Sequence, residues 1–222
     1  MNRTPFIPAW LLFLFAAASP LWLSAQSTGS FTRVEIGPSL TNLDALNMAL
    51  ADRQLPELGG LMGAAGISHL RVHKHWALSG HMFNFMQRSL MGPNYEKSIV
   101  NFNYALLRAG YGWWNSDETV MLYPAIGLGG GLANVRTRRV GQGEPVPSWS
   151  GGALGDVSLN VSKFVPMPDG SGQVTEWGFS VGYMSIAGMG WNQKNFDPDT
   201  PVLRVSPQGF YIRLSLGMGR WR

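Results

Sequence analysis

The chain has 222 residues, of which 14% are charged and 12% aromatic, and it contains 28 glycines and no cysteine. Soluble proteins have roughly 25% charged residues, so this composition is poor in the side chains that cover a water-exposed surface. The formal net charge of +4 is too small to indicate a nucleic-acid partner. Without cysteine, disulfides and thiolate metal sites are excluded, and the length favours a single folded domain.

The first residues have the pattern of an export signal. Arg3 supplies a positive charge, residues 9–18 are all apolar, and Ala25 offers a small residue for cleavage. A membrane-spanning helix needs about 20 apolar residues, whereas Pro20 interrupts this stretch, which favours cleavage over an uncleaved anchor. We predict a signal peptide over residues 1–25 and one barrel domain over residues 26–222.

Eight later segments alternate apolar residues with small or polar ones, the period of two that a β-strand requires. An up-and-down membrane barrel with long external loops and short periplasmic turns predicts alternating long and short connections, as found here. The predicted strands are residues 31–40, 59–72, 75–88, 98–111, 118–135, 152–165, 173–188 and 205–221. The mostly long connections are 41–58, 89–97, 136–151 and 189–204, and the short ones are 73–74, 112–117 and 166–172.

The first long connection contains a helix signal. Thr41 to Asp44 matches a capping pattern, and Leu43, Leu46 and Leu50 recur at helical spacing. We predict a short amphipathic helix near residues 42–54. Three roles stay open for it: covering the barrel mouth, resting on the membrane surface or binding a partner.

The fourth and fifth strands carry their patterns differently. In residues 98–108 the side chains of Val100, Phe102, Tyr104 and Leu106 share one face, which we expect to meet lipid, and the asparagines share the other. The uncharged stretch of residues 120–135 contains four glycines and a proline, which make a transmembrane helix poor. It is therefore predicted as a strand with a small-residue inner face.

The last two strands alternate most regularly. Trp177 and Phe179 share one face of the seventh, opposite Ser180. In the eighth strand, Leu214 opposes Ser215 in the same way. Five tryptophans lie near the predicted short turns, where they are expected to form an interfacial aromatic girdle: Trp76, Trp113, Trp114, Trp177 and Trp221.

A secreted soluble barrel or sandwich would also alternate. The non-apolar face of these strands is dominated by Gly, Ser, Ala and Asn, whereas water-facing strands usually carry Lys, Glu and Thr. Small residues suit a narrow lumen. The composition of this face therefore favours a membrane barrel.

The signal sequence, the eight strands and the final segment from Gly209 to Arg222 together resemble the small outer-membrane barrels of the OmpA and OmpX kind, within the porin-like superfamily. The resemblance covers nearly all of the chain after the signal. It implies an all-β, eight-stranded antiparallel transmembrane barrel in the outer membrane of a Gram-negative cell, inserted by the barrel assembly machinery and surrounded by outer-membrane lipid. The family usually ends its last strand on an aromatic residue, whereas here Arg222 follows Trp221.

Five charged residues fall on the predicted inner face. Mixed charges in a confined interior must pair to offset their desolvation, so we predict a structural charge network in the lumen. An acid/base pair or an ion path is the alternative, although an eight-stranded barrel is normally filled by its own side chains. The residues are Arg33, Glu35, Asp156, Glu176 and Arg213.

Histidines offer two further kinds of site. His69, His73 and His75 lie close in sequence, but their spacing matches no zinc signature, and we predict neither a metal nor a cofactor. Ser79 and His81 share one strand parity, so they could act as nucleophile and base of a lipid-modifying hydrolase.

Three arginines begin the third predicted long loop: Arg136, Arg138 and Arg139. Their guanidinium groups are suited to the phosphates of outer-leaflet glycolipid, and ordinary interfacial anchoring is the alternative. The leading functional prediction is a non-enzymatic outer-membrane barrel with a structural or surface-interaction role, in which the long extracellular loops bind an unidentified ligand. The alternatives are an outer-membrane lipid-modifying hydrolase and a narrow channel.

Overall fold

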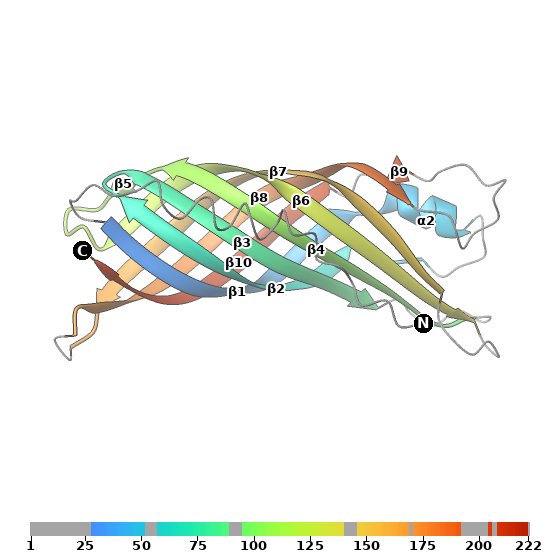
Figure 1. Cartoon of the computed structure of the whole chain (residues 1–222), viewed down its shortest axis with the longest axis horizontal. Coiled ribbons are helices and arrows are strands. Elements are labelled where there is room, and N and C mark those ends of the chain that lie inside the picture. The colour runs from blue at the N-terminus through green and yellow to red at the C-terminus, as the bar shows by residue number, and fades with distance from the viewer. Residues whose placement is uncertain are drawn as a thin grey trace, which may run out of the picture.

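The structure, a computed structural model, describes residues 28–51, 57–88, 95–139, 146–168, 171–191, 204–205 and 208–221. The predicted signal peptide lies outside these residues. The backbone forms an antiparallel sheet that curls into a barrel (Figure 1). Eight long strands pair in chain order, and β10 (Gln208–Trp221) closes the wall by pairing with both β8 (Gln173–Trp191) and β1 (Thr28–Asn42). The predicted eight-stranded antiparallel up-and-down barrel is confirmed.

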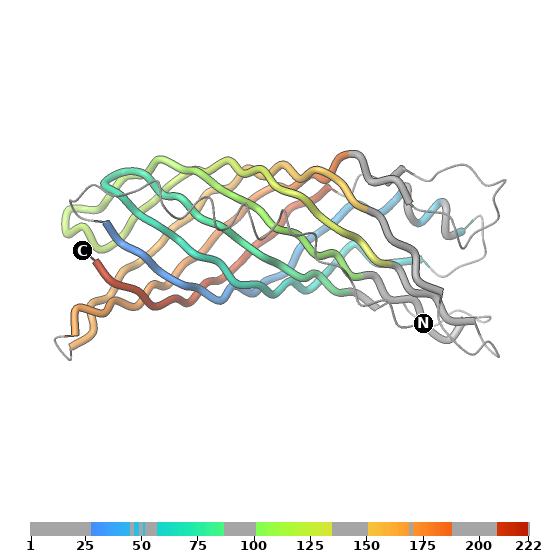
Figure 2. The backbone as a smooth tube through the Cα atoms, in the orientation of Figure 1, coloured from blue at the N-terminus to red at the C-terminus, as the bar shows by residue number. Residues whose placement is uncertain are grey.

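Closure satisfies the backbone of the first and last strands on both sides. Figure 2 shows β1 beside β10 at the end of the barrel where the short turns lie. Two short strands extend this wall, and the first long connection contains the helix α2 (Asp44–Ala51). The remaining strands are β2 (Leu61–His73), β3 (Trp76–Arg88), β4 (Tyr95–Tyr111), β5 (Trp113–Trp114), β6 (Val120–Arg139), β7 (Val146–Pro166) and β9 (Arg204–Val205).

The third long connection is shorter than predicted. β6 and β7 remain paired as far as Thr137 opposite Val146, so the predicted loop 136–151 is wrong and the connection is reduced to residues 140–145, outside the described part. Backbone pairing continues beyond the point where the apolar alternation stops, because ladder hydrogen bonds do not require lipid-facing side chains. For the same reason Trp149 and Trp191, predicted in long connections, belong to β7 and β8.

The outer wall is apolar over most strands. On β10 the outward side chains from Phe210 to Met218 are all large, hydrophobic and exposed, as predicted. The uncharged segment forms part of β6, with Ile126 and Leu128 exposed and Ala125 buried, again as predicted. No helix among the described residues is long and apolar enough to cross a membrane.

One strand has its faces reversed relative to the prediction. On β4, Phe102, Tyr104 and Leu106 point into the barrel, and Asn103 points outward. Arg108 has the parity of the aromatic residues and is also buried. The apolar side chains fill the lumen here, because an interior needs volume as much as it needs polarity.

The lumen is stacked in three layers. Along β3 the inward side chains run from Ala77 through Ser79 and His81 to Phe83 and Phe85. The first belongs to a turn-side cluster, which consists of Phe31, Leu70, Val72, Ala77, Met121, Tyr123, Ala125, Phe164 and Val174, with Trp114 and Trp221 packed against it. The last two belong to a loop-side cluster, which consists of Leu43, Leu58, Met62, Ala64, Phe83, Phe85, Phe102, Tyr104, Leu106, Ala133, Leu154, Met184, Ile186 and Tyr211. The buried polar residues between the two clusters form the polar layer, which includes Arg33, Glu35, Ser79, His81, Arg108, Asp156 and Glu176.

The first long connection folds over the loop-side mouth. Leu43 and Leu58, which flank α2, are buried in the loop-side cluster. The Asn47 side chain donates to the Leu58 carbonyl and accepts from the Leu58 amide, both at 2.9 Å. Asn42, rather than Thr41, accepts from the Asp44 amide at the start of the helix, at 2.9 Å. Of the three roles left open for the helix, this geometry favours covering the mouth.

Candidate functional site

The polar layer is built around Arg33. Its Nη2 lies 3.1 Å from Oε1 of Glu35 and its Nη1 lies 3.5 Å from Oε1 of Glu176. Its Nε donates to the Ser68 hydroxyl at 2.9 Å, and that hydroxyl in turn donates to Glu35. Ser162 donates to Glu176 at 2.7 Å. One guanidinium therefore joins two carboxylates, one on its own strand β1 and one on β8, with hydroxyl groups supporting both.

Glycines make room for these charges. A Cβ built at Gly178 would lie 2.6 Å from Glu176 Oε1 and 2.0 Å from the Ser215 hydroxyl. One built at Gly217 would lie 2.6 Å from the Arg33 side chain. All three contacts are too short for real atoms, so the small residues on the inner face leave room for the carboxylate as well as fitting the narrow lumen.

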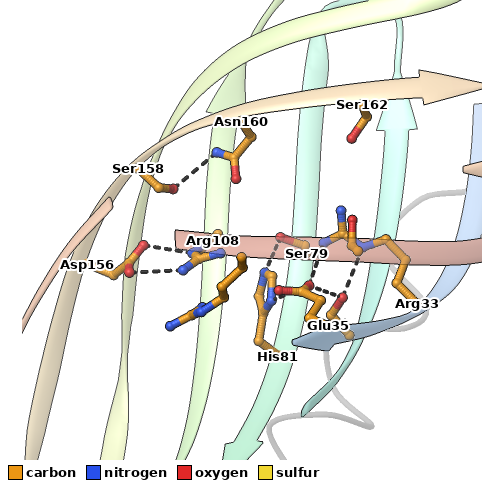
Figure 3. Close-up of polar contacts among 12 residues, drawn as sticks. Arg33, Glu35, Ser79, His81, Arg108, Asp156, Ser158, Asn160 and Ser162 are labelled. Carbon is orange, nitrogen blue, oxygen red and sulfur yellow. Dashed lines mark hydrogen bonds and ion pairs between the residues drawn. The ribbon is translucent and has the colours of Figure 1, made fainter. Parts of the chain in front are cut away.

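A second ion pair joins β4 to β7. Arg108 Nε and Nη2 donate to the two oxygens of Asp156 at 2.7 and 2.9 Å, the two-bonded geometry that matches a guanidinium to a carboxylate. The Tyr211 hydroxyl donates to the same carboxylate at 2.8 Å and accepts from Arg108 at 2.6 Å. Figure 3 shows Arg108 and Asp156 facing each other. All three groups are buried.

Arg213 is held in a different way. Its guanidinium carbon lies 4.0 Å from the centre of the Phe83 ring and 3.8 Å from that of Tyr211, and its Nη2 donates to the Tyr104 hydroxyl. Among the described residues its Nε and Nη1 have no hydrogen-bond partner, and no carboxylate forms a salt bridge with it. Aromatic faces therefore replace the ion pair that the sequence predicted for this cation.

Ser79, His81 and Glu35 form an ordered chain. The Ser79 hydroxyl lies 2.7 Å from His81 Nε2, and His81 Nδ1 lies 3.1 Å from Glu35 Oε1, as a contact whose direction falls short of a hydrogen bond (Figure 3). The order resembles that of a serine hydrolase triad. However, all three side chains are buried inside the lumen between the two apolar clusters, whereas a lipid-modifying site must face lipid.

A small cavity adjoins the polar layer. Its volume is about 10 Å³, close to the least that holds one water molecule. Polar lining is contributed by Arg33, Arg108, Asn160 and Ser180, among others. The cavity is too small for a substrate.

The five predicted lumen charges are all buried, and four of them take part in ion pairs. Arg108 was missed, because the two faces of β4 were predicted the wrong way round. Its parity with the aromatic residues of β4 was the available signal. Tyr104 and Tyr211 were not recognised as polar partners, because tyrosine also fits an apolar wall.

Other candidate residues are scattered over the barrel. Arg136, Arg138 and Arg139 lie in the last residues of β6, and their side chains are outside the described set. His69 accepts or donates to the hydroxyls of Ser30 and Thr32 at 3.1 and 3.3 Å on the outer wall. No group of three metal-binding side chains occurs among the described residues.

The five tryptophans of the predicted girdle fall into an outward-facing group and an inward-facing group. Trp76, Trp113 and Trp177 are exposed on the outer wall at the turn side. Trp114 and Trp221 instead pack against the turn-side cluster, with ring centres 5.8 Å apart. The penultimate Trp221 therefore helps to close the turn-side end of the lumen.

The fold and the site together define a small closed β-barrel with an apolar outer wall and a lumen filled by its own side chains. Comparison of the sequence with protein-family models and with curated proteins found no match. Among solved structures, the chain is similar to Neisserial surface protein A, with 12% identity, a TM-score of 0.45 and coverage of 86% of this chain and 98% of that one. It is also similar to the attachment invasion locus protein Ail of Yersinia pestis, with 9% identity, a TM-score of 0.46 and coverage of 87% and 99%. Ail in complex with the heparin analogue sucrose octasulfate gives 11% identity, a TM-score of 0.44 and coverage of 87% and 99%.

Proposed function

We propose that the protein is a non-enzymatic outer-membrane barrel with a structural or surface-interaction role through its long loops. The observation that carries this proposal is the belt of exposed large hydrophobic side chains around a closed sheet. Ile126, Leu128 and Phe210 are 69%, 77% and 63% exposed. In water such a wall would aggregate, whereas in a bilayer it matches the hydrocarbon.

The ends of the barrel support a membrane orientation. Trp76, Trp113 and Trp177 lie at the turn side, where aromatic side chains anchor barrels at the membrane interface. We place this side in the periplasm and the loop side with α2 outside the cell. Export by the signal peptide and insertion by the barrel assembly machinery belong to the same proposal.

The filled lumen weighs against the two alternative functions. A channel needs a continuous polar path, whereas the polar layer lies between the turn-side and loop-side clusters. A lipid-modifying hydrolase needs its nucleophile at the lipid-facing wall, whereas Ser79 is 6% exposed inside the barrel. We therefore assign the proposed surface interaction to the loop end of the barrel.

Arg136, Arg138 and Arg139 are proposed contacts for phosphates of outer-leaflet glycolipid. They lie beyond the apolar part of β6, at the loop end of the strand. Arginine matches phosphate oxygens with two parallel hydrogen bonds, which suits this boundary. For the long loops we propose an unidentified ligand at the cell surface.

The test is to refold the chain from residue 26 into lipid vesicles and compare heated and unheated samples on a detergent gel. A closed barrel should migrate differently before and after heating, and planar bilayers containing it should show no unitary conductance. Folded, monomeric protein in detergent-free buffer would contradict the membrane proposal. Stable single-channel steps would instead support the channel.

A further inference from the structure

The outer wall carries a pair of amides among its apolar side chains. Asn84 on β3 and Asn103 on β4 are direct cross-strand partners, and both are exposed. Asn84 Nδ2 donates to Asn103 Oδ1 at 2.8 Å. The pair therefore forms one polar spot on the face that the proposed function gives to lipid.

Apolar side chains flank the spot on two neighbouring strands. Met82 and Met86 precede and follow Asn84 on the same face of β3, and they are 46% and 51% exposed. On β6, the residue opposite Asn103 is the exposed Leu132. Apolar side chains therefore border the two amides on β3 and β6, whereas on β4 the next outward residue towards the loop side is a further amide, Asn101.

One hydrogen bond does not satisfy two amides. Each side chain has two N–H donors and one carbonyl acceptor. Among the described residues, no hydrogen bond is made by Asn84 Oδ1 or by Asn103 Nδ2. Lipid chains offer no partner for either group, and polar groups in hydrocarbon are costly unless they are paired.

Two outward neighbours of the amides are small. Ala65 lies opposite Asn84 on β2, and Ala105 follows Asn103 on the outward face of β4. Small residues allow another protein surface to approach closely in a membrane, which brings interfacial hydrogen bonds within reach.

We propose that the wall of β3 and β4 is an interface with a second copy of this chain. The patch presents an unused acceptor, Asn84 Oδ1, beside an unused amide nitrogen, Asn103 Nδ2. A two-fold axis between two copies pairs the acceptor of each with the donor of the other, so the patch is complementary to itself. This inference rests on the proposed membrane location, since water would satisfy the amides of a soluble barrel.

The test uses the absence of native cysteine. Ala105→Cys places one thiol beside the amide pair, and Ser185→Cys places one on the outward face of β8, on the other side of the barrel. In lipid vesicles, oxidation should cross-link the Ala105→Cys protein into a dimer and leave the Ser185→Cys protein monomeric. Equal cross-linking of both, or of neither, would overturn the proposal.

Replacing both amides gives the second measurement. Asn84→Leu with Asn103→Leu suits a lipid-facing wall, so the barrel should still insert and keep its heat-dependent migration. The dissociation constant of the dimer should rise about tenfold, as expected for the loss of two hydrogen bonds of modest strength. A matched Ser185→Leu variant should dimerise normally.

The outcomes separate the two proposals. A heat-modifiable barrel in vesicles that remains monomeric, or whose dimerisation is unchanged by the two leucines, rejects the self-association interface and leaves the membrane proposal standing. Failure of the unmodified chain to insert rejects the membrane proposal itself. Heat-modifiable migration of the double variant shows that its loss of dimer is not a loss of folding.

Discussion

At the residue scale, the Arg108–Asp156 pair links β4 to β7, the two neighbours of β6, through two hydrogen bonds. Asp156→Ala leaves a buried guanidinium without its carboxylate. Removal of one partner from a buried pair typically costs about 3–5 kcal/mol. We expect a loss of that order in the free energy of unfolding, measured by urea titration of the protein in lipid vesicles.

The matched control replaces both partners. Arg108→Met with Asp156→Leu removes the two charges together and keeps much of the volume. Because neither charge is then left unpaired, the double variant should be more stable than Asp156→Ala. A double variant less stable than the single one would show that the pair contributes by more than mutual compensation.

Gly178 offers a second test at this scale. A Cβ at this position meets the Ser215 hydroxyl and the Glu176 carboxylate, so Gly178→Ala should force the polar layer apart and cost about 1–3 kcal/mol of stability, as overpacking usually does. Gly155→Ala is the control, since a Cβ there meets nothing within 4 Å. Similar urea midpoints for the two variants would argue against tight packing around Glu176.

Strand parity predicted part of the site and missed part of it. Arg33, Glu35, Asp156, Glu176 and Arg213 were placed inside because their neighbours on each strand are clearly lipid-facing. The partners were not predictable, because cross-strand register depends on closure of the barrel. The aromatic surroundings of Arg213 could not be predicted without knowing that Phe83 and Tyr104 point inward.

At the element scale, β8 and β10 have clearly different faces. Leu214 and Phe179 are 57% and 44% exposed, whereas Ser180 is buried and Ser215 half-buried. Leu214→Arg or Phe179→Arg should cost about 2–4 kcal/mol, the usual penalty for arginine near the middle of a bilayer. Urea titration in vesicles measures this cost.

The serines of the same strands give the comparison. Ser180→Asn and Ser215→Asn face the lumen and need not match hydrocarbon. They should lower the free energy of unfolding by less than the arginine variants do. Ser215→Asn should be the more destabilising of the two, because Ser215 contacts Glu176 at 3.4 Å. The reverse order would indicate that the two faces are inverted.

The faces of β4 were predicted wrongly because they are harder to tell apart than those of β8 and β10. On β8 and β10 the inner face consists largely of glycine and serine, so the larger apolar face must be outside. On β4 the choice lies between aromatic residues and asparagines, and either face fits an interior that needs both bulk and polar groups. Only the position of Arg108 on the aromatic face distinguishes the two orientations.

At the scale of the whole molecule, the chain has the opposite arrangement to a soluble protein. Among the described residues, three arginines and three carboxylates lie buried inside the barrel, while large hydrophobic side chains cover the outside. Composition and the alternation of long and short connections predicted this architecture from the sequence. The closure of the lumen by two apolar clusters was not predictable, because it depends on which side chains meet across the barrel.

The most direct test of the account is the environment of a single outward side chain. Leu214→Cys introduces the only thiol of the chain, which can carry a fluorescent label. In vesicles, brominated acyl chains should quench this label strongly, and aqueous iodide should quench it weakly, because position 214 faces hydrocarbon. Strong quenching by iodide, with no effect of brominated lipid, would contradict the membrane barrel.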